Sequence, residues 1–148
     1  MNVQNLQRCA LAAAFVAGTV FSSSACARDT VRSYFIDAAL KSEPVDNDIP
    51  LYFAGQRHPA MLRSFGVFNA SRKTNSFGKS DEAACQHVFL SAVMALQQRA
   101  RKKGGNAVIN IRSNYHSSEM RSATQFECGA GGVIAGVALK GEIVKLEK

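Results

Sequence analysis

The fold is decided by residues 80–105, which have the sequence SDEAACQHVFLSAVMALQQRARKKGG. A polar N-cap at Ser80 or Asp81, acids in the first turn and a glycine pair at the end predict a helix from about Asp81 to Lys103. At 100° per residue, one stripe of this helix is apolar and must be buried. It consists of Cys85, Val88, Phe89, Ala92, Val93, Leu96 and Ala100.

Strand patterns occur on both sides of the helix. They cover residues 49–53, 60–68, 106–115, 122–128 and 136–146. Residues 69–79 are polar and basic and predict a loop. We therefore expect an α+β fold, a two-layer domain in which one long helix packs on a mainly antiparallel sheet of about four to five strands.

Alternation within the strands predicts which side chains face the helix. In residues 106–115 they are Ala107, Ile109 and Ile111, and in residues 122–128 they are Thr124, Phe126 and Cys128. Gly141 is expected to form a bend or bulge in the last strand.

Residues 1–27 have the plan of a signal peptide. One positive charge precedes a thirteen-residue apolar run, Cys9 to Phe21, and small residues follow it. A bilayer needs about 20 helical residues, so we expect cleavage after Ala27 and export to the periplasm. Two alternatives stay open. One is an uncleaved membrane anchor; the other is an outer-membrane lipoprotein attached through Cys26, although Ser23 stands where a lipobox has an apolar residue.

Cleavage leaves residues 28–148, enough for one hydrophobic core. Residues 28–48 are expected to form an N-terminal arm, and residues 49–148 the single α+β domain. The chain has 18 Lys and Arg against 11 Asp and Glu, a net charge of +7. For an exported protein this charge favours an envelope protein or an acidic envelope component as partner, not nucleic acid, and a membrane only if Cys26 is lipidated.

Two cysteines remain after cleavage, Cys85 and Cys128. The helical and strand periodicities place both on the core side, and a pair in an oxidising compartment favours a disulfide. The bridge would close a loop of about 43 residues, for which the chain-entropy model gives at most roughly 4 kcal/mol. Two buried free thiols are the alternative.

The sequence contains no complete catalytic motif. Gly78-Lys79-Ser80 is similar to the end of a phosphate-binding loop, but Lys73 stands where the first glycine of that motif belongs, so a helix cap is the better interpretation. The glycine-rich residues 129–136 predict a close-packed turn between strands. We therefore expect a protein that is not an enzyme and uses no cofactor.

His58, His87 and His116 are the candidate ligand-binding residues. His87 lies about 200° from Cys85 around the helix, so these two cannot share one ion, and paired zinc ligands are absent from the sequence. No metal site is predicted. A further cluster, Arg99, Arg101, Lys102 and Lys103, is either an anionic docking patch or a set of cations that offset the negative end of the helix, and the second interpretation is favoured.

The helix-to-strand step at residues 100–109, ARKKGGNAVI, resembles the YbjQ-like family of proposed heavy-metal-binding proteins and the Rcs envelope-stress sensor lipoprotein. The first resemblance implies a helix on an antiparallel sheet in a ring-shaped homo-oligomer. The second implies disulfides and an envelope partner. Nearly the whole chain is similar to exported proteobacterial proteins often labelled excinuclease ATPase subunit, with matches at His58-Pro59, residues 73–81, Ala84-Cys85, residues 89–92, residues 104–108, Cys128 and residues 135–141.

These observations predict an exported, non-enzymatic envelope interaction or stress-response module that a disulfide stabilises. A small-ligand or metal-binding periplasmic module that uses the three histidines is the alternative.

Overall fold

The structure is a computed structural model that describes residues 30–148. The expected leader, its cleavage site and Cys26 lie outside the described residues. In chain order the elements are β1 (Thr30–Phe35), α1 (Ile36–Ser42), β2 (Leu51–Phe53), β3 (Met61–Asn75), α2 (Asp81–Lys103), β4 (Ala107–Tyr115), β5 (Ser118–Met120), β6 (Gln125–Ala130) and β7 (Ile134–Leu146).

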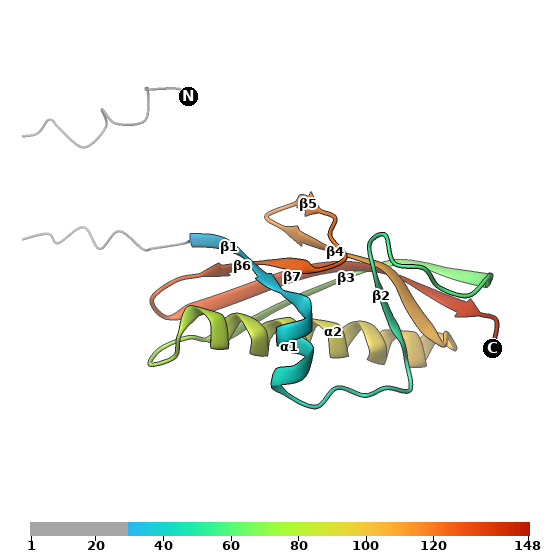
Figure 1. Cartoon of the computed structure of the whole chain (residues 1–148), viewed down its shortest axis with the longest axis horizontal. Helices are drawn as coiled ribbons and strands as arrows, with labels where there is room; N and C mark the ends of the chain where they lie inside the picture. The colour runs from blue at the N-terminus through green and yellow to red at the C-terminus, as the bar shows by residue number, and fades with distance from the viewer. Residues whose placement is uncertain (1–29) are drawn as a thin grey trace, which may run out of the picture.

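The described chain forms one seven-stranded sheet with α2 along one face (Figure 1). We call the other side of the sheet the open face; the β4–β5 hairpin rises from it. The expected mixture of a long helix and a mainly antiparallel sheet is confirmed, but the sheet is larger than four to five strands. The two additional strands are β1, in the segment expected to be an arm, and the short β5.

β7 is the centre of the sheet. One of its edges pairs with β3 along the whole strand, and the other pairs with β4 and, near its start, with β6. β1 continues the sheet beyond β6, while β2 and β5 pair with β4. The pairing of β2 with β4 is parallel, and the other pairings are antiparallel.

The predicted helix has the predicted bounds and caps. The Ser80 hydroxyl accepts a hydrogen bond from the backbone N–H of Ala83, and Gly104 ends the helix in the left-handed conformation, with φ 76°. All seven residues of the predicted stripe are buried. Phe89 stacks on Phe126 of β6 with ring centroids 4.1 Å apart, which anchors the helix to the sheet.

A disulfide joins Cys85 of α2 to Cys128 of β6, with the two Cα atoms 5.9 Å apart. Both residues are fully buried. The predicted bridge between the helix and the sheet is therefore confirmed.

The loop expected at residues 69–79 is wrong for most of its length. Residues 69–75 continue β3, and each of them pairs with β7 from Lys140 back to Ile134. An edge strand is held by backbone hydrogen bonds to a single neighbouring strand. Pairing with the apolar β7 can therefore stabilise as strand a polar, basic segment whose own sequence lacks a strand pattern. The loop is confined to the residues between Asn75 and Asp81.

Three expected side-chain directions are also wrong, those of Ala107, Ile109 and Thr124. A bulge after Ile109, with Asn110 at φ 51°, leaves Ala107 and Ile109 in a small cluster on the open face, whereas Ile111 faces α2 as expected. Thr124 precedes β6 and is exposed. Gly141 pairs regularly with Phe68 of β3, but on its other side the register shift of the β4 ladder falls opposite it. The expected irregularity is therefore present at Gly141, with the extra residue in β4.

The acidic, Pro-bounded link between α1 and β2 is tied to α2. The buried side-chain amide of Gln97 donates to the carbonyl oxygens of Asp46, at 2.7 Å, and of Ile49, at 2.9 Å. The Arg101 guanidinium donates to Asp48 at 2.8 Å and to Asp46 at 2.9 Å. Residues 28–48, which were expected to form an arm, thus contribute to the domain a strand, a helix and part of a link that is hydrogen-bonded to α2.

Candidate anion-binding groove between α2 and β3

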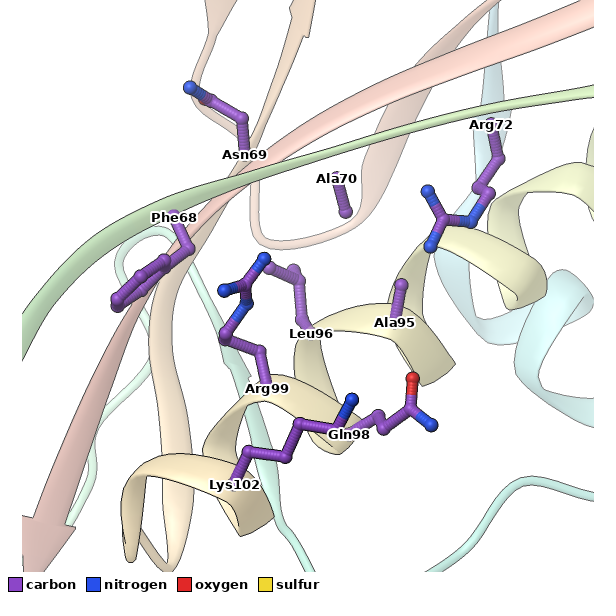
Figure 2. A pocket seen from close by; sticks show the side chains of 9 residues that line it. All are labelled: Phe68, Asn69, Ala70, Arg72, Ala95, Leu96, Gln98, Arg99 and Lys102. Atoms are coloured by element: carbon purple, nitrogen blue, oxygen red, sulfur yellow. The ribbon is translucent and has the colours of Figure 1, made fainter.

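A groove of about 200 Å³ lies where α2 crosses the edge of the sheet (Figure 2). β3 and α2 both contribute to its lining, and no carboxylate takes part. The lining residues are Phe68, Asn69, Ala70, Arg72, Ala95, Leu96, Gln98, Arg99 and Lys102.

The local structure explains why the cations gather there. On α2, Ala95, Arg99 and Lys102 are four and three residues apart, which puts them on one stripe beside the buried one. On β3, Phe68, Ala70 and Arg72 alternate, so they share one face of the strand. That face is the one toward α2, because Ala70 is buried and pairs with buried Leu139. Figure 2 shows the Arg72 and Arg99 guanidinium groups in the space between strand and helix.

The positive charges of the groove are not neutralised within the described chain. No ion pair in residues 30–148 involves Arg72, Arg99 or Lys102. Arg99 and Lys103 lie over the ring of Phe68, at 5.3 and 5.8 Å from its centroid, so this ring holds the cations in place without cancelling them. An anion that enters the groove would meet three unpaired cations.

The structure divides the basic cluster that the sequence suggested. Arg101 points to the acidic link, where its hydrogen bond holds the pKa of Asp48 below the ordinary value. Arg99 and Lys102 instead line the groove. Arg72 joins them from β3, and the sequence does not place it there because the polar residues 69–79 predict a loop. Residues 69–75 show no apolar alternation, so no local signal in the sequence marks Arg72 as part of a strand.

A second charged cluster, on the open face, is satisfied by its own members. Glu119 accepts from Lys140 at 2.8 Å and from Arg112 at 3.0 Å, and Arg121 lies 3.5 Å away. The hydrogen bonds from Lys140 and Arg112 lower the pKa of Glu119 to about 2. This cluster holds the β4–β5 hairpin to β7, which is a structural role.

The three candidate histidines lie on different elements. His58, between β2 and β3, has Nδ1 2.8 Å from the carbonyl oxygen of Pro59. His87 of α2 has Nδ1 2.8 Å from Glu43 Oε1. His116 is in the β4–β5 turn, with its ring 4.3 Å from that of Tyr115. Within residues 30–148, no three His, Cys, Asp or Glu side chains come together as metal ligands would.

The glycine-containing motifs have structural roles. Ser80 caps α2, and Lys79 donates its backbone N–H to the carbonyl of Ser76 in the preceding turn. Residues 131–133 form the turn between β6 and β7. In the part of the chain that the structure describes, no helix is both long and apolar enough to cross a membrane.

Comparison with protein-family models and with curated proteins finds no match to this chain. The resemblance to YbjQ-like and sensor lipoproteins therefore stays a prediction.

Proposed function

We propose that the mature chain is an exported, non-enzymatic interaction module that holds an acidic envelope partner in the groove between α2 and β3. The observation that carries the proposal is the set of three cations, Arg72, Arg99 and Lys102, in a concave site whose lining contains no acid. Charge of this kind steers and orients an oppositely charged partner.

Two further observations support the exported part of the proposal. Residues 1–27 have the plan of a leader, and the buried bridge between Cys85 and Cys128 suits an oxidising compartment. Export would also separate the basic groove from nucleic acid and leave acidic envelope components as its partners.

The test compares two double variants of equal charge. Arg99→Ala/Lys102→Ala removes two cations of the groove, and Lys79→Ala/Lys148→Ala removes two cations outside its lining. Binding of a fluorescent poly-glutamate peptide is followed by anisotropy at low and at high salt. The groove variant should bind about tenfold more weakly, as expected from two exposed charge contacts, and the control within about twofold of the native protein. Equal losses in both variants would show that net charge alone holds the peptide.

A small-ligand module is the second candidate, and one observation favours it. An apolar hollow of about 410 Å³ lies between α1 and β2, lined in part by Phe35, Leu40, Leu51 and Phe53. None of the three histidines lines it. Native mass spectrometry with zinc and copper tests whether the module binds a metal. Titration with an apolar dye tests whether the hollow binds an apolar ligand. Stoichiometric metal retention that His58→Ala, His87→Ala or His116→Ala abolishes would favour the metal form.

A further inference from the structure

β3 is an edge strand with a free side. Within residues 30–148 its one strand partner is β7, and no element pairs with its outer edge. The two register shifts of the ladder lie before Gly66, so residues 67–75 form a regular, unbulged stretch of edge. The groove opens beside this stretch, because Phe68, Ala70 and Arg72 belong to both.

The hydrogen-bonding register shows which backbone groups point outward. Ser76 donates its N–H to the carbonyl of Val133 and so starts the ladder between β3 and β7. Antiparallel pairing alternates, so Thr74, Arg72 and Ala70 direct their backbone groups to β7. The residues between them, Asn69, Ser71 and Lys73, direct theirs away from the sheet. Among residues 30–148, the Ser71 carbonyl accepts a hydrogen bond only from the Arg72 guanidinium of its own strand, at 2.9 Å.

Small side chains leave room for another strand next to β3. Ala70 lies between Phe68 and Arg72 on the face toward α2, and Ala95 lines the groove from the helix. A strand added to β3 would lie about 4.8 Å further out, beneath the stripe of α2 that carries Arg99 and Lys102. Its side chains on the helix side would enter the groove, and those of alternate residues would face the open side.

We propose that the groove and the outer edge of β3 together form a docking site for an extended acidic peptide, which adds to the sheet as a strand. The proposal deepens the proposed function and rests on it. Backbone hydrogen bonds to Asn69, Ser71 and Lys73 hold the peptide, and acidic side chains spaced two residues apart contact Arg72, Arg99 and Lys102. The site therefore selects alternating acidic sequences over other sequences of the same charge.

The positive charge of β3 argues against a second copy of this chain as the molecule that pairs with its outer edge. β3 carries Arg63, Arg72 and Lys73 and no acid, and the adjoining stripe of α2 adds Arg99 and Lys102. Pairing two β3 strands edge to edge would bring these like charges together, which is destabilising across strands. An acidic partner gains from the same charges.

The first experiment compares two labelled peptides of identical composition, TETETETE and EEEETTTT, on the full mature chain. Strand addition predicts that the alternating peptide binds at least about tenfold more tightly. Equal affinities that both fall in Arg99→Ala/Lys102→Ala would overturn strand addition and leave the proposed function standing. No binding of either peptide would overturn both.

The second experiment removes backbone donors. The alternating peptide is N-methylated either at all threonines or at all glutamates, because alternate N–H groups of an added strand face opposite edges. One isomer should lose binding and the other should keep it. Methylation at the threonines should abolish binding if the peptide adds antiparallel to β3, and methylation at the glutamates should abolish it if the peptide adds parallel. Two isomers that behave alike would overturn the proposal.

Ser71→Pro removes a backbone donor from the protein, as N-methylation does from the peptide. The lost N–H is one that points away from β7, and proline is tolerated at such a position of an edge strand. The variant should abolish preference for the alternating peptide, with native thermal unfolding as the check on folding. If native mass spectrometry finds a dimer that Ser71→Pro dissociates, the edge belongs to a second copy and the proposal falls. Should this variant not fold, the methylated peptides still decide the question.

Discussion

The ionisation of Glu119 affects stability in acid. Lys140 and Arg112 donate to it and lower its pKa from an ordinary 4.5 to about 2. Because the pKa is lower in the folded chain, the stabilisation is fully present above the unfolded pKa and is lost as pH falls toward 2. Glu119→Gln should therefore flatten the decline in unfolding free energy between about pH 4.5 and 2. Urea titrations at several pH values measure this slope, and Glu147→Gln, at the exposed C-terminus, is the control that should keep it.

Gly141 is required because the helix and the neighbouring strand pass so close to it. A Cβ at this position would lie 2.7 Å from Val108 Cγ1 and 3.2 Å from Leu96 Cδ1. Gly141→Ala should therefore lower the unfolding free energy by about 1–3 kcal/mol through overpacking. Gly132→Ala is the matched control, because a Cβ there meets nothing within 4 Å. Equal denaturation midpoints for the two variants would contradict the packing argument.

At the scale of elements, the disulfide joins α2 to β6 across 43 residues of sequence. Cys85→Ala/Cys128→Ala should lower the unfolding free energy by about 2–4 kcal/mol, mostly by giving the unfolded chain more freedom. Urea unfolding with and without reductant measures the loss. Reductant should shift the native protein by a similar amount and leave the double variant unchanged; a shift in the variant would point to another cause.

Gln97 connects α2 to the link before β2. Its amide is the hydrogen-bond donor to two carbonyl groups of the link, at Asp46 and Ile49, and the side chain is 1% exposed. Gln97→Met keeps the size but leaves both carbonyls without this donor, at an expected cost of about 1–3 kcal/mol. The variant should also be cut faster by protease within residues 43–50. Gln98→Met, one position along and exposed, should change neither measurement.

Elements with local signals, such as caps and an apolar stripe, were predictable from the sequence. The prediction was wrong where pairing with a distant segment determines the secondary structure. α2 carries its own caps and a continuous apolar stripe, so its bounds, its buried face and the direction of Cys85 were all predictable. Residues 69–75 of β3 are strand because β7 pairs with them, and no local pattern records that partner. A single left-handed residue, Asn110, breaks the alternation of this strand, so Ile111 faces α2 as expected but Ala107 and Ile109 do not.

The α2 half of the candidate site was predictable from the sequence, and the β3 half was not, because it depends on pairing with β7. The cations of α2 were visible as a cluster, but their division depends on where other segments pack. Arg101 meets the acidic link, whereas Arg99 and Lys102 face β3. Arg72 was hidden with the rest of its strand.

For the whole molecule, paired charges and unpaired cations lie on different sides of α2. The segment from α1 to β2 carries Asp37, Glu43, Asp46 and Asp48, and these pair with Lys41, His87 and Arg101. The opposite side of α2, toward β3, keeps cations without acids. Within residues 30–148, the unpaired cations Arg72, Arg99 and Lys102 therefore lie where an edge strand and a groove are open.

Export determines where the mature chain begins. Cleavage after Ala27 would make Arg28 the first residue, two positions before β1, so the strand and its pairing with β6 would stay complete. Intact-mass measurement of the protein from periplasm should give residues 28–148 with two hydrogens fewer than the reduced chain, no lipid, and no reaction with iodoacetamide until reductant is added. A diacylglyceryl mass on Cys26 would assign the lipoprotein alternative. Retention of residues 1–27, or two thiols that react in the native protein, would remove the compartment on which the proposed acidic envelope partner depends.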